Sequence, residues 1–400
     1  MDFSHSDKVK ELLARVTAFM DEHVYPNEKT YADQMTAFGA DRWQVPQIVE
    51  DLKVKAREAG LWNLFLPESD RGAGLSNLEY SALCEVMGRS GFASEVFNCA
   101  APDTGNMEVL ERYGNERHKR EYLQPLLDGK IRSAFLMTEP DVASSDATNI
   151  ETSIVREGDE YVINGRKWWS SGVGDPRCKI AIVMGKTDPD AETYRQQSQI
   201  LMPLDTPGIE IIDIDHVGLR YARTCDVVFD NVEIDAEHIL GGIEGWNKGW
   251  NMLASEALDV EKLEISSVAL GIAHAAMDEA WEYAQQRRQF GKPISAHQSV
   301  RHDLVEARTK LQACDHMLYH AAHLAQNREP CSVETSMAKL FIGDTTLEIV
   351  LKCQQVMGAY GCTSEYAMER HVRDILVMPI VGGSSKIQKN NIAARLRLSQ

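Results

Sequence analysis

The sequence has 400 residues, of which 44% are hydrophobic and 26% are charged, and its formal net charge is −18 at pH 7. This composition is typical of a globular protein with two or three domains. The acidic balance disfavours nucleic acid and anionic lipid as partners, so any phosphate ligand must be held locally by a few basic residues or by helix N-termini.

The cysteines and the N-terminal residues indicate the compartment. The eight cysteines include no Cys-x-x-Cys pair and follow no repeated spacing, so neither a disulfide framework nor a structural zinc site is indicated. The first residues, MDFSHSDKVKELLARV, lack the apolar segment of a signal peptide, and their acidic residues argue against a transit peptide. No segment approaches the roughly 20 apolar residues of a membrane span. We therefore expect a soluble, cytoplasmic protein.

The pattern of apolar residues changes twice along the chain. From about residue 6 to 132, apolar residues recur three and four positions apart, which predicts helices. From about 134 to 235, short alternating runs cut by Gly, Pro, Asp and Asn predict strands and turns. Helical periodicity then returns over 247–288, 297–326, 332–357 and 385–398. This order predicts an α+β protein with a β domain between two helical domains, at 1–133, 134–240 and 241–400.

Two segments of the predicted β domain carry residues suited to a ligand. In FLMTEPDVASSDA, residues 135–147, a strand ends at Thr138, and the backbone N–H groups that follow can hold the polar edge of a cofactor. A strand followed by an Asx turn explains the same pattern. In INGRKWWSSG, residues 163–172, Asn164-Gly165 predicts a hairpin turn. Trp168 and Trp169 then alternate sides, so that one can face a flat ligand, although adjacent tryptophans also serve in packing.

One carboxylate lies on the apolar face of a predicted helix. When residues 257–272, ALDVEKLEISSVALGI, are placed about 100° apart, Glu261 falls within an apolar stripe. A helix kink, a different helix phase or a buried ion pair explains such a residue, and a functional carboxylate is the alternative. The apolar members of the stripe are Ala257, Leu258, Ile265, Val268, Ala269 and Ile272.

The later helices contain two groups of basic residues. RRQFGKPI, residues 287–294, surrounds a predicted helix end at Gly291, and it fits a pyrophosphate site and a helix C-cap equally well. His316, His320 and His323 lie one turn apart, but no carboxylate or cysteine is spaced to complete a metal site, so we expect no metal. The chain also lacks GxGxxG after a strand, GxxxxGK[ST] and GxSxG, so a Rossmann site, a P-loop and a hydrolase elbow are not indicated.

Together, in their order and spacing, the motifs resemble the acyl-CoA dehydrogenase family over nearly the whole chain. The resemblance rests on YGNERHKREYLQPLLDGKIRSAF, TEPDVASSDA, INGRKWW, RRQFGKPI and QVMGAYGCTSEYAMERHVRDILVMPIVGGSSKIQ. The stretch TEPDVASSDATNI is similar to the branch of family members 10 and 11. This resemblance implies FAD and a homotetramer built as a dimer of dimers. It also implies an N-terminal helical domain, a central β-barrel or sheet domain and a C-terminal four-helix bundle.

The resemblance also implies site residues by position. Phe135, Met137 and Thr138 would lie against the isoalloxazine ring, and Trp169 and Ser171 would lie near flavin N5. For the substrate, Ser144 would contact the pantetheine arm, with a one-residue ambiguity caused by Ser145, while Asp259 and Lys262 would lie near the CoA end of the acyl site. The residues implied for an FAD site shared with a neighbouring subunit are Arg287, Phe290, Gln355, Gly358, Ala359, Ser384 and Lys386.

The position of the catalytic base is a departure from much of the family. Many members carry a glutamate in a YEGT-type stretch, where this chain has Gly382 within Val381-Gly382-Gly383-Ser384. A minority, including the isovaleryl-type and long-chain members, carry the base in an LDxER-like stretch, which LDVEK at 258–262 matches with Glu261. We therefore expect Glu261 to be the base, with a pKa raised by burial above the usual value near 4.3. We also expect the small Gly382 to free space beside the substrate α-carbon.

The implied reaction is the α,β-dehydrogenation of an acyl-CoA. Glu261 would remove the α-proton, the β-hydrogen would leave as hydride to flavin N5, and the product would be a trans-2-enoyl-CoA. The resemblance names an electron-transfer flavoprotein as electron acceptor. It also names the flavin ribityl 2′-hydroxyl and the backbone N–H of the base residue as donors to the thioester oxygen.

Two other functions stay open from the sequence. A non-catalytic acyl-CoA- or FAD-binding subunit of a mixed oligomer is favoured by Gly382. An acyl-CoA oxidase is disfavoured, because oxidase chains usually carry an added helical domain for which 400 residues leave no room.

Overall fold

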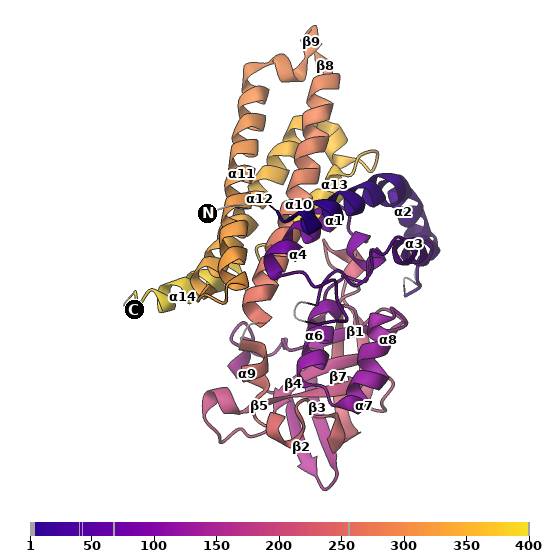
Figure 1. Ribbon diagram of the computed structural model, residues 1–400, viewed down its shortest axis with the longest axis vertical. Coiled ribbons are helices and arrows are strands. Elements are labelled where there is room, and N and C mark those ends of the chain that lie inside the picture. The colour runs from indigo at the N-terminus through magenta and orange to yellow at the C-terminus, as the bar shows by residue number, and fades with distance from the viewer. Residues whose placement is uncertain (1–4, 40, 42, 67–68, 255–256, 399–400) are drawn as a thin grey trace.

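A computed structural model describes residues 5–39, 41, 43–66, 69–254 and 257–398 (Figure 1). The chain forms helices, then a sheet, then long helices, and this order confirms the prediction. Figure 1 shows the sheet towards one end of the molecule, while the hairpin of α10 (Ala257–Gln286) and α11 (Gln298–Gln326) extends towards the other. None of the helices in the described ranges is both long enough and apolar enough to cross a bilayer.

Two of the N-terminal helices, α1 (Asp7–Phe19) and α4 (Asn77–Gly88), begin at serine caps. The Ser6 side chain accepts the Val9 amide at the start of α1, and Ser76 forms a reciprocal capping box with Glu79 at the start of α4. Apolar residues spaced three and four apart then bury one face of each of these two helices in a common core. These helices are α1 (Asp7–Phe19), α2 (Glu28–Ala37), α3 (Gln47–Glu58), α4 (Asn77–Gly88), α5 (Ala93–Val96), α6 (Asp103–Tyr113), α7 (Glu116–His118) and α8 (Gln124–Leu127).

Seven strands form one mixed sheet in the order β1-β4-β2-β3-β7-β6, with β5 paired to β4. The pairs of β4 with β1 and with β2 are parallel, and the other pairs are antiparallel. Alternate side chains of these strands build a second core inside the sheet domain. The strands are β1 (Arg132–Leu136), β2 (Ser153–Glu157), β3 (Glu160–Ser170), β4 (Cys178–Lys186), β5 (Gln197–Pro203), β6 (Ile209–Asp213) and β7 (Cys225–Asp235).

The predicted hairpin turn at Asn164-Gly165 is wrong. Strand β3 runs through both residues, and the turn between β2 and β3 lies at Gly158-Asp159. Asn164 accepts a hydrogen bond of 2.8 Å from the Asn231 amide of β7, and the register between these strands shifts at this point. A Cβ on Gly165 would clash with Thr152. The Asn-Gly pair therefore builds an irregularity inside the sheet, where glycine allows a close backbone approach.

The C-terminal helices pack on a third core, built from α10, α11, α12 and α13. Small residues such as Ala273 and Ala276 let α10 approach its neighbours closely, while Leu311 and Ile342 fill the space between the helices. Short α13 was not predicted. Besides α10 and α11, this part contains α9 (Gly249–Ala254), α12 (Ser332–Met357), α13 (Met368–Ile375) and α14 (Ser385–Arg395).

The predicted helix 247–288 is α9 and α10, on either side of 255–256, which lie outside the described residues. Helix α10 ends at Gln286, so the predicted helix end at Gly291 is wrong. RRQFGKPI forms a two-stranded hairpin, β8 (Arg288–Gln289) and β9 (Lys292–Pro293). Phe290 and Gly291 make its turn with φ of 51° and 81°, and glycine readily adopts the latter value.

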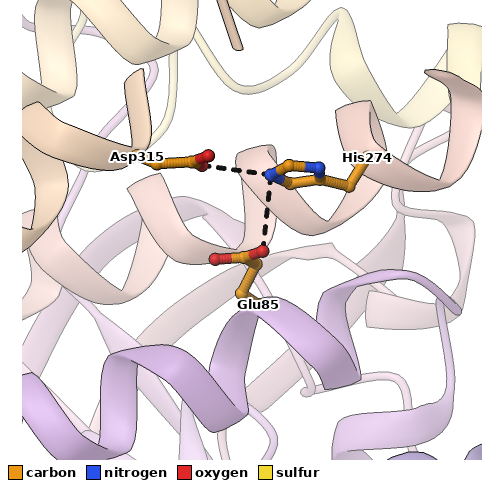
Figure 2. Close-up of side chains that lie close together, drawn as sticks. All are labelled: Glu85, His274 and Asp315. Carbon is orange, nitrogen blue, oxygen red and sulfur yellow. Dashed lines mark hydrogen bonds and ion pairs between the residues drawn. The ribbon is translucent and has the colours of Figure 1, made fainter. Parts of the chain in front are cut away.

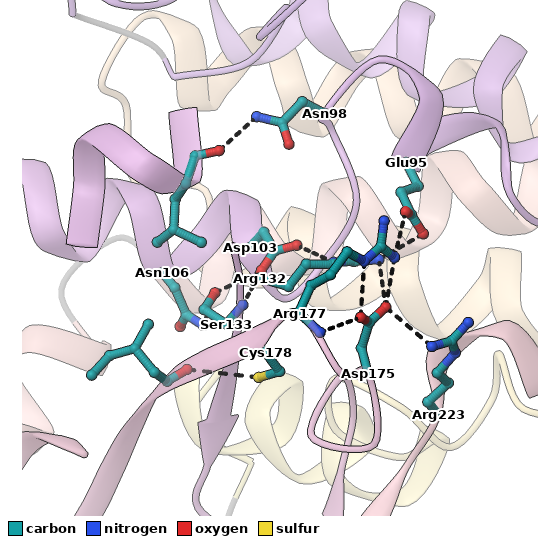
Figure 3. Close-up of polar contacts among 12 residues, drawn as sticks. Glu95, Asn98, Asp103, Asn106, Arg132, Ser133, Asp175, Arg177, Cys178 and Arg223 are labelled. Atoms are coloured by element: carbon teal, nitrogen blue, oxygen red, sulfur yellow. Dashed lines mark hydrogen bonds and ion pairs between the residues drawn. The ribbon is translucent and has the colours of Figure 1, made fainter. Parts of the chain in front are cut away.

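A buried network of ion pairs ties the sheet to the N-terminal helices (Figure 3). Arg132, at the start of β1, contacts Glu95 of α5 at 2.6 Å and Asp103 of α6 at 2.7 Å. Arg177, just before β4, contacts Glu95 at 2.8 Å and Asp175 at 2.6 Å. The guanidinium groups and carboxylates face one another in Figure 3, so each buried charge has opposite partners.

A smaller polar cluster joins three helices (Figure 2). His274 of α10 places Nε2 at 3.0 Å from Asp315 Oδ1 of α11 and at 3.4 Å from Glu85 Oε1 of α4. Their ligand atoms all lie within 4.8 Å of one another, a spacing compatible with a metal ion. The imidazole already bridges both carboxylates, so hydrogen bonding and charge pairing account for the arrangement. This cluster is separate from His316, His320 and His323.

Candidate active site

Glu261 lies early in α10 and turns one carboxylate oxygen towards the turn that precedes α14. A Cβ placed on Gly382 would lie 3.7 Å from Glu261 Oε1. The glycine that replaces the usual glutamate and the glutamate on the earlier helix therefore meet in space. Because positions 261 and 382 lie next to each other, the Glu261 carboxylate can occupy the region that a side chain at residue 382 would otherwise reach.

The apolar stripe does not bury Glu261 as predicted. Its side chain is exposed on the isolated chain, and Leu258 and Ile265 are only half-buried. Among the apolar members of the stripe, Ala269 and Ile272 are fully buried, where α4, α11 and α12 surround the helix. The start of α10 thus leaves one side of the carboxylate open, while the other side faces the turn at Gly382.

The expected free space at Gly382 is also absent. A Cβ on this residue would clash with Cδ1 of Ile265, which lies one helical turn after Glu261. Gly382 has a φ of 60° and Gly383 a φ of 83°, a region that favours glycine. Ile265 therefore fills the volume that the missing side chain vacates, and the turn keeps two glycines because its backbone requires them.

Charged neighbours act on Glu261 in opposite directions. Desolvation by the surrounding protein raises its pKa, and the positive charges of Lys262 and Lys339 partly offset that rise. The exposed surface of Glu261 does not contradict this direction, because protein crowds one side of the carboxylate while water reaches the other. Burial lowers the pKa of Lys339 to about 8, and its Nζ donates to Met378 O at 3.0 Å.

A second carboxyl lies close to the base. Burial, together with the negative charges of Glu108 and Glu261, raises the pKa of Glu264 to about 8. Glu264 is therefore mainly protonated at neutral pH, and it adds no full negative charge beside Glu261. Sequence reasoning missed both Glu264 and Lys339. Lys339 interrupts the apolar run MAKLFI, a signal of the same kind that singled out Glu261.

Asp259 and Lys262 are occupied in joining α10 to α12. Lys262 Nζ lies 2.9 Å from Asp259 Oδ1 and donates to Ser336 at 3.2 Å. Ser332 and Thr335 donate to the same Asp259 carboxylate at 2.6 and 2.8 Å. These bonds fix the start of α10, and therefore the height of Glu261, against α12.

The predicted flavin-facing residues of the sheet domain lie along one edge. Strand β1 ends at Leu136, two residues before the predicted end at Thr138. Thr138 then pairs with Trp168: its hydroxyl donates to Trp168 O at 2.9 Å and its carbonyl accepts the Trp168 amide at 3.0 Å. Phe135, Met137 and Thr138 are all half-buried. The Thr138 hydroxyl proton is thus already used in the bond to Trp168 O, so a hydrogen bond from Thr138 to the flavin ring would require the hydroxyl to turn.

A buried ion pair holds this edge in place. Lys167 is fully buried, and its Nζ lies 2.7 Å from both Glu139 Oε1 and Met137 O. The Glu139 carboxylate also accepts the amides of Glu151 and Thr152. Burial lowers the pKa of Lys167 to about 8, so the ammonium persists at neutral pH. One lysine thus connects β3 to the segment that carries Met137 and Thr138.

The two adjacent tryptophans lie as the alternation predicts. Trp168 is half-buried, whereas Trp169 keeps 49% of its surface exposed at a φ of 53°. The irregular register between Lys167 and Ser170 turns Trp169 outward. Ser171 lies two residues further on and shares a 3.1 Å hydrogen bond with Thr224. An open indole beside Thr138 suits the packing of a planar ring, so these residues fit a flavin.

Ser144 points into its own loop. Its hydroxyl accepts the Glu139 amide at 3.0 Å and donates to Glu139 O at 3.1 Å, and the residue is buried. Ser145 is exposed. Since the pantetheine contact was ambiguous by one residue, the accessible hydroxyl at this position belongs to Ser145.

The remaining predicted flavin residues lie in three places: on the hairpin after α10, at the end of α12 and at the start of α14. Arg287 and Phe290 lie at the far end of the α10–α11 hairpin, and Phe290 is 92% exposed. Gln355, Gly358 and Ala359 are exposed at the end of α12, near the contact of Tyr360 with Tyr283 of α10. Ser384 and Lys386 instead lie at the start of α14, where Ser384 caps the helix by accepting the Ile387 amide. One chain therefore does not bring the hairpin residues to the flavin edge.

Comparisons with known proteins agree over the whole chain. Family models described as the N-terminal, middle and C-terminal domains of acyl-CoA dehydrogenase match residues 6–130, 134–232 and 247–397. The chain is 40% identical to "Probable acyl-CoA dehydrogenase FadE2" of Mycobacterium tuberculosis, covering 100% of this chain and 98% of that protein. It is 39% identical to acyl-CoA dehydrogenase family member 11 of Gallus gallus, where it covers 98% of this chain but only 51% of that protein.

Solved structures share the same architecture. A structure from Mycobacterium abscessus, described among the acyl-CoA dehydrogenases, superposes with a TM-score of 0.93 at 38% identity and covers 99% of both chains. A glutaryl-CoA dehydrogenase from Mycobacterium smegmatis, in complex with FADH2, superposes with a TM-score of 0.83 at 25% identity, over 98% of this chain and 95% of that one.

Proposed function

Because this chain belongs to the acyl-CoA dehydrogenase family, we propose that it oxidises an acyl-CoA thioester at Cα and Cβ, with Glu261 as the base. The observation that carries this proposal is the approach of Glu261 Oε1 to Gly382. It places a carboxylate where the family's usual glutamate would project, although residue 382 has no side chain.

We propose FAD as the cofactor, held by the edge of Phe135, Met137, Thr138, Trp169 and Ser171. When bound, FAD supplies the acceptor for the hydride that leaves Cβ. The open indole of Trp169 and its neighbour Thr138 support this assignment, because they present a flat and partly apolar surface. The Lys167–Glu139 pair keeps that surface in register with β3.

Glu261 takes the α-proton on its free carboxylate oxygen. A solvated glutamate is a weak base for a thioester α-hydrogen, and the raised pKa improves the match. Substrate on the open side of Glu261 excludes more water and raises the pKa further. The electrons of the Cα–H bond form the Cα=Cβ bond as the β-hydrogen leaves, which gives a trans-2-enoyl-CoA.

Of the two donors to the thioester oxygen that the resemblance implied, the backbone N–H of the base residue must be replaced by another group. The Glu261 amide lies within α10, where helical hydrogen bonding uses it. In contrast, the amides of Gly382 and Gly383 have no hydrogen-bond partner among the described residues. We propose that this turn donates to the thioester oxygen, so that the carboxylate and the N–H come from different elements.

We further propose a homotetramer, built as a dimer of dimers, that passes electrons to an electron-transfer flavoprotein. The exposed hairpin residues Arg287 and Phe290 support assembly, because they lie far from the flavin edge of their own chain. They would complete the flavin site of a neighbouring subunit. The chain spans only 37% of the length of family member 10 and 51% of the length of family member 11. Substrates of these longer relatives are therefore only hypotheses for this chain.

The test is anaerobic mixing of the purified, flavin-loaded protein with a panel of acyl-CoA thioesters. The wild type should bleach the flavin band, and Glu261→Gln should bind FAD and acyl-CoA but bleach at least about 100-fold more slowly. Glu282→Gln, on the exposed face of the same helix, is the matched control and should keep the wild-type rate. Undiminished bleaching by Glu261→Gln would reject the base. Binding without bleaching by the wild type would indicate a non-catalytic subunit, and rapid peroxide formation in air an oxidase.

A further inference from the structure

One buried side chain holds the glycine turn beside Glu261. Gln388, in the first turns of α14, is only 1% exposed. Its Nε2 donates to Gly382 O at 3.1 Å and to Gly383 O at 2.9 Å. A single amide group therefore uses both of its protons on two consecutive carbonyls of the turn that faces the base.

The turn depends on this amide for its conformation. Gly382 and Gly383 are the residue type with the most backbone freedom, and both have positive φ. Ser385 also closes the loop, through its amide, which donates to Pro379 O at 2.9 Å, and its hydroxyl, which donates to the same oxygen at 3.4 Å. A Cβ on Gly383 would lie 2.7 Å from Gln388 Nε2, so the glutamine also packs directly on the turn.

Gln388 is retained at an energetic cost. Its Oε1 is buried and has no hydrogen-bond partner among the described residues. An unpaired buried carbonyl oxygen destabilises the folded state relative to an apolar side chain of similar size. The two bonds made by Nε2 are what an apolar residue could not supply.

We infer that Gln388 is a positioning residue for the proposed dehydrogenation. It fixes the peptide units of Gly382 and Gly383 so that their free N–H groups face the thioester oxygen while Glu261 faces the α-carbon. The inference rests on the proposed function. Because catalysis depends on donor placement to within about 1 Å, a turn that wanders should lower the rate of proton removal far more than it weakens substrate binding.

The test compares two methionine variants of the flavin-loaded protein. Gln388→Met keeps the length of the side chain but removes both donors. Gln199→Met is the control, because Gln199 is also 1% exposed, donates to the Gly249 carbonyl at 3.0 Å, has an unpartnered Oε1 and lies in β5. We expect Gln388→Met to slow anaerobic flavin reduction about tenfold or more with acyl-CoA affinity changed less than about threefold. Gln199→Met should lower the melting temperature at an unchanged rate.

Hydrogen exchange provides a readout that does not need turnover. Backbone amides of peptides spanning 379–388 should exchange faster in Gln388→Met and at the wild-type rate in Gln199→Met. Unchanged exchange, or a rate of flavin reduction equal to that of the wild type, would overturn the inference. If the wild type fails to bleach with every acyl-CoA, the proposed function fails, and exchange alone still decides whether Gln388 holds the turn.

Discussion

At the scale of single residues, the pKa of Glu261, the proposed base, results from a balance between desolvation and nearby cations. Desolvation strengthens the carboxylate as a base by raising its pKa, and Lys262 and Lys339 limit that rise. Lys262 is fixed by Asp259 and Ser336. Lys339 instead donates to the backbone carbonyl of Met378, so its charge can be removed with less loss of side-chain pairing.

Replacing Lys339 should move the pH dependence of flavin reduction. Glu261 must be ionised to act, so the rate falls as pH drops through its raised pKa. Lys339→Met removes a positive charge that lowers this pKa, and the acid limb of the profile should therefore shift to higher pH. Stopped-flow flavin reduction across the pH range measures the shift. Lys352→Met, on the same helix but paired with Asp303 and Glu306, should leave the limb in place. A shift to lower pH would contradict the argument.

At the scale of secondary-structure elements, buried ion pairs join the apolar contacts that connect the sheet to helices α5 and α6. Desolvation alone would raise the pKa of Glu95, but Arg132, Lys53 and Arg177 outweigh it and hold the pKa well below its usual value. Arg177 and Arg132 lower the pKa of Asp175 in the same way. Carboxyls with depressed pKa stabilise the fold above their unfolded-state pKa, and this contribution disappears as pH falls through the folded-state pKa.

Neutralising Glu95 should expose this contribution. At pH 7, Glu95→Gln should lower the free energy of unfolding by about 3–5 kcal/mol, because it leaves buried guanidinium groups underpaired. The difference from wild type should shrink as pH falls below about 4, where Glu95 of the unfolded wild type takes up a proton, and it should vanish only as pH passes through the depressed folded-state pKa. Urea titrations at several pH values measure both effects. Glu121→Gln, in an exposed pair with Arg117, should leave the free energy of unfolding nearly unchanged, because solvent screens such pairs. An equal loss for both variants would refute the network's role.

Periodicity predicted the long helices well and the irregular elements poorly. The predicted 332–357 matches α12, and 297–326 matches α11 within one residue, because each buries a continuous apolar face. Asn164-Gly165 was misassigned, since its local turn preference is overridden by pairing with Asn231 on a strand distant in sequence. The hairpin at Phe290 was missed because its two-residue strands are too short to show alternation.

The candidate site was predicted in part for the same reason. Sequence singled out Glu261, and the structure brings it beside Gly382. The predicted rise in the pKa of Glu261 agrees in direction with desolvation, although its side chain is exposed on the isolated chain. The predicted space at Gly382 is filled by Ile265, whose position depends on how α10 meets its neighbours. Gln388 contributes through contacts between elements, which no local pattern encodes, whereas Lys339 was missed although it interrupts an apolar run.

At the scale of the whole molecule, the predicted flavin residues are spread over regions that lie far apart. Figure 1 shows β8 and β9 at one end of the long helices and the sheet towards the other. The hairpin end presents exposed aromatic side chains, with Phe290 at 92% and Trp281 at 42% exposure. Large exposed apolar groups of this kind mark binding surfaces, so the hairpin is suited to contact a neighbouring subunit.

Truncating Phe290 should weaken cofactor retention without unfolding the chain. The ring makes few contacts within its own chain, so Phe290→Ala should keep the wild-type melting temperature of the apoprotein. We expect FAD to be retained about tenfold less tightly, if the ring anchors on a neighbouring subunit. Flavin content after gel filtration, with light scattering to test for a mass about four times 44.8 kDa, measures both properties. Ile243→Ala is the control, because Ile243 is also highly exposed, at 73%, but lies before α9 in the chain and not on the hairpin. Equal flavin loss in both variants would argue against the hairpin.

The packing of Ile265 against Gly382 also constrains how this active site can evolve. Restoring a glutamate at 382 would place a side chain on Ile265 and on a left-handed backbone, which costs about 1–2 kcal/mol in conformation alone. The half-buried Ile265 would also have to move or be shortened. On the proposed assignment of Glu261 as the base, moving that role to residue 382 therefore requires coordinated changes at residues 382 and 265 rather than a single substitution.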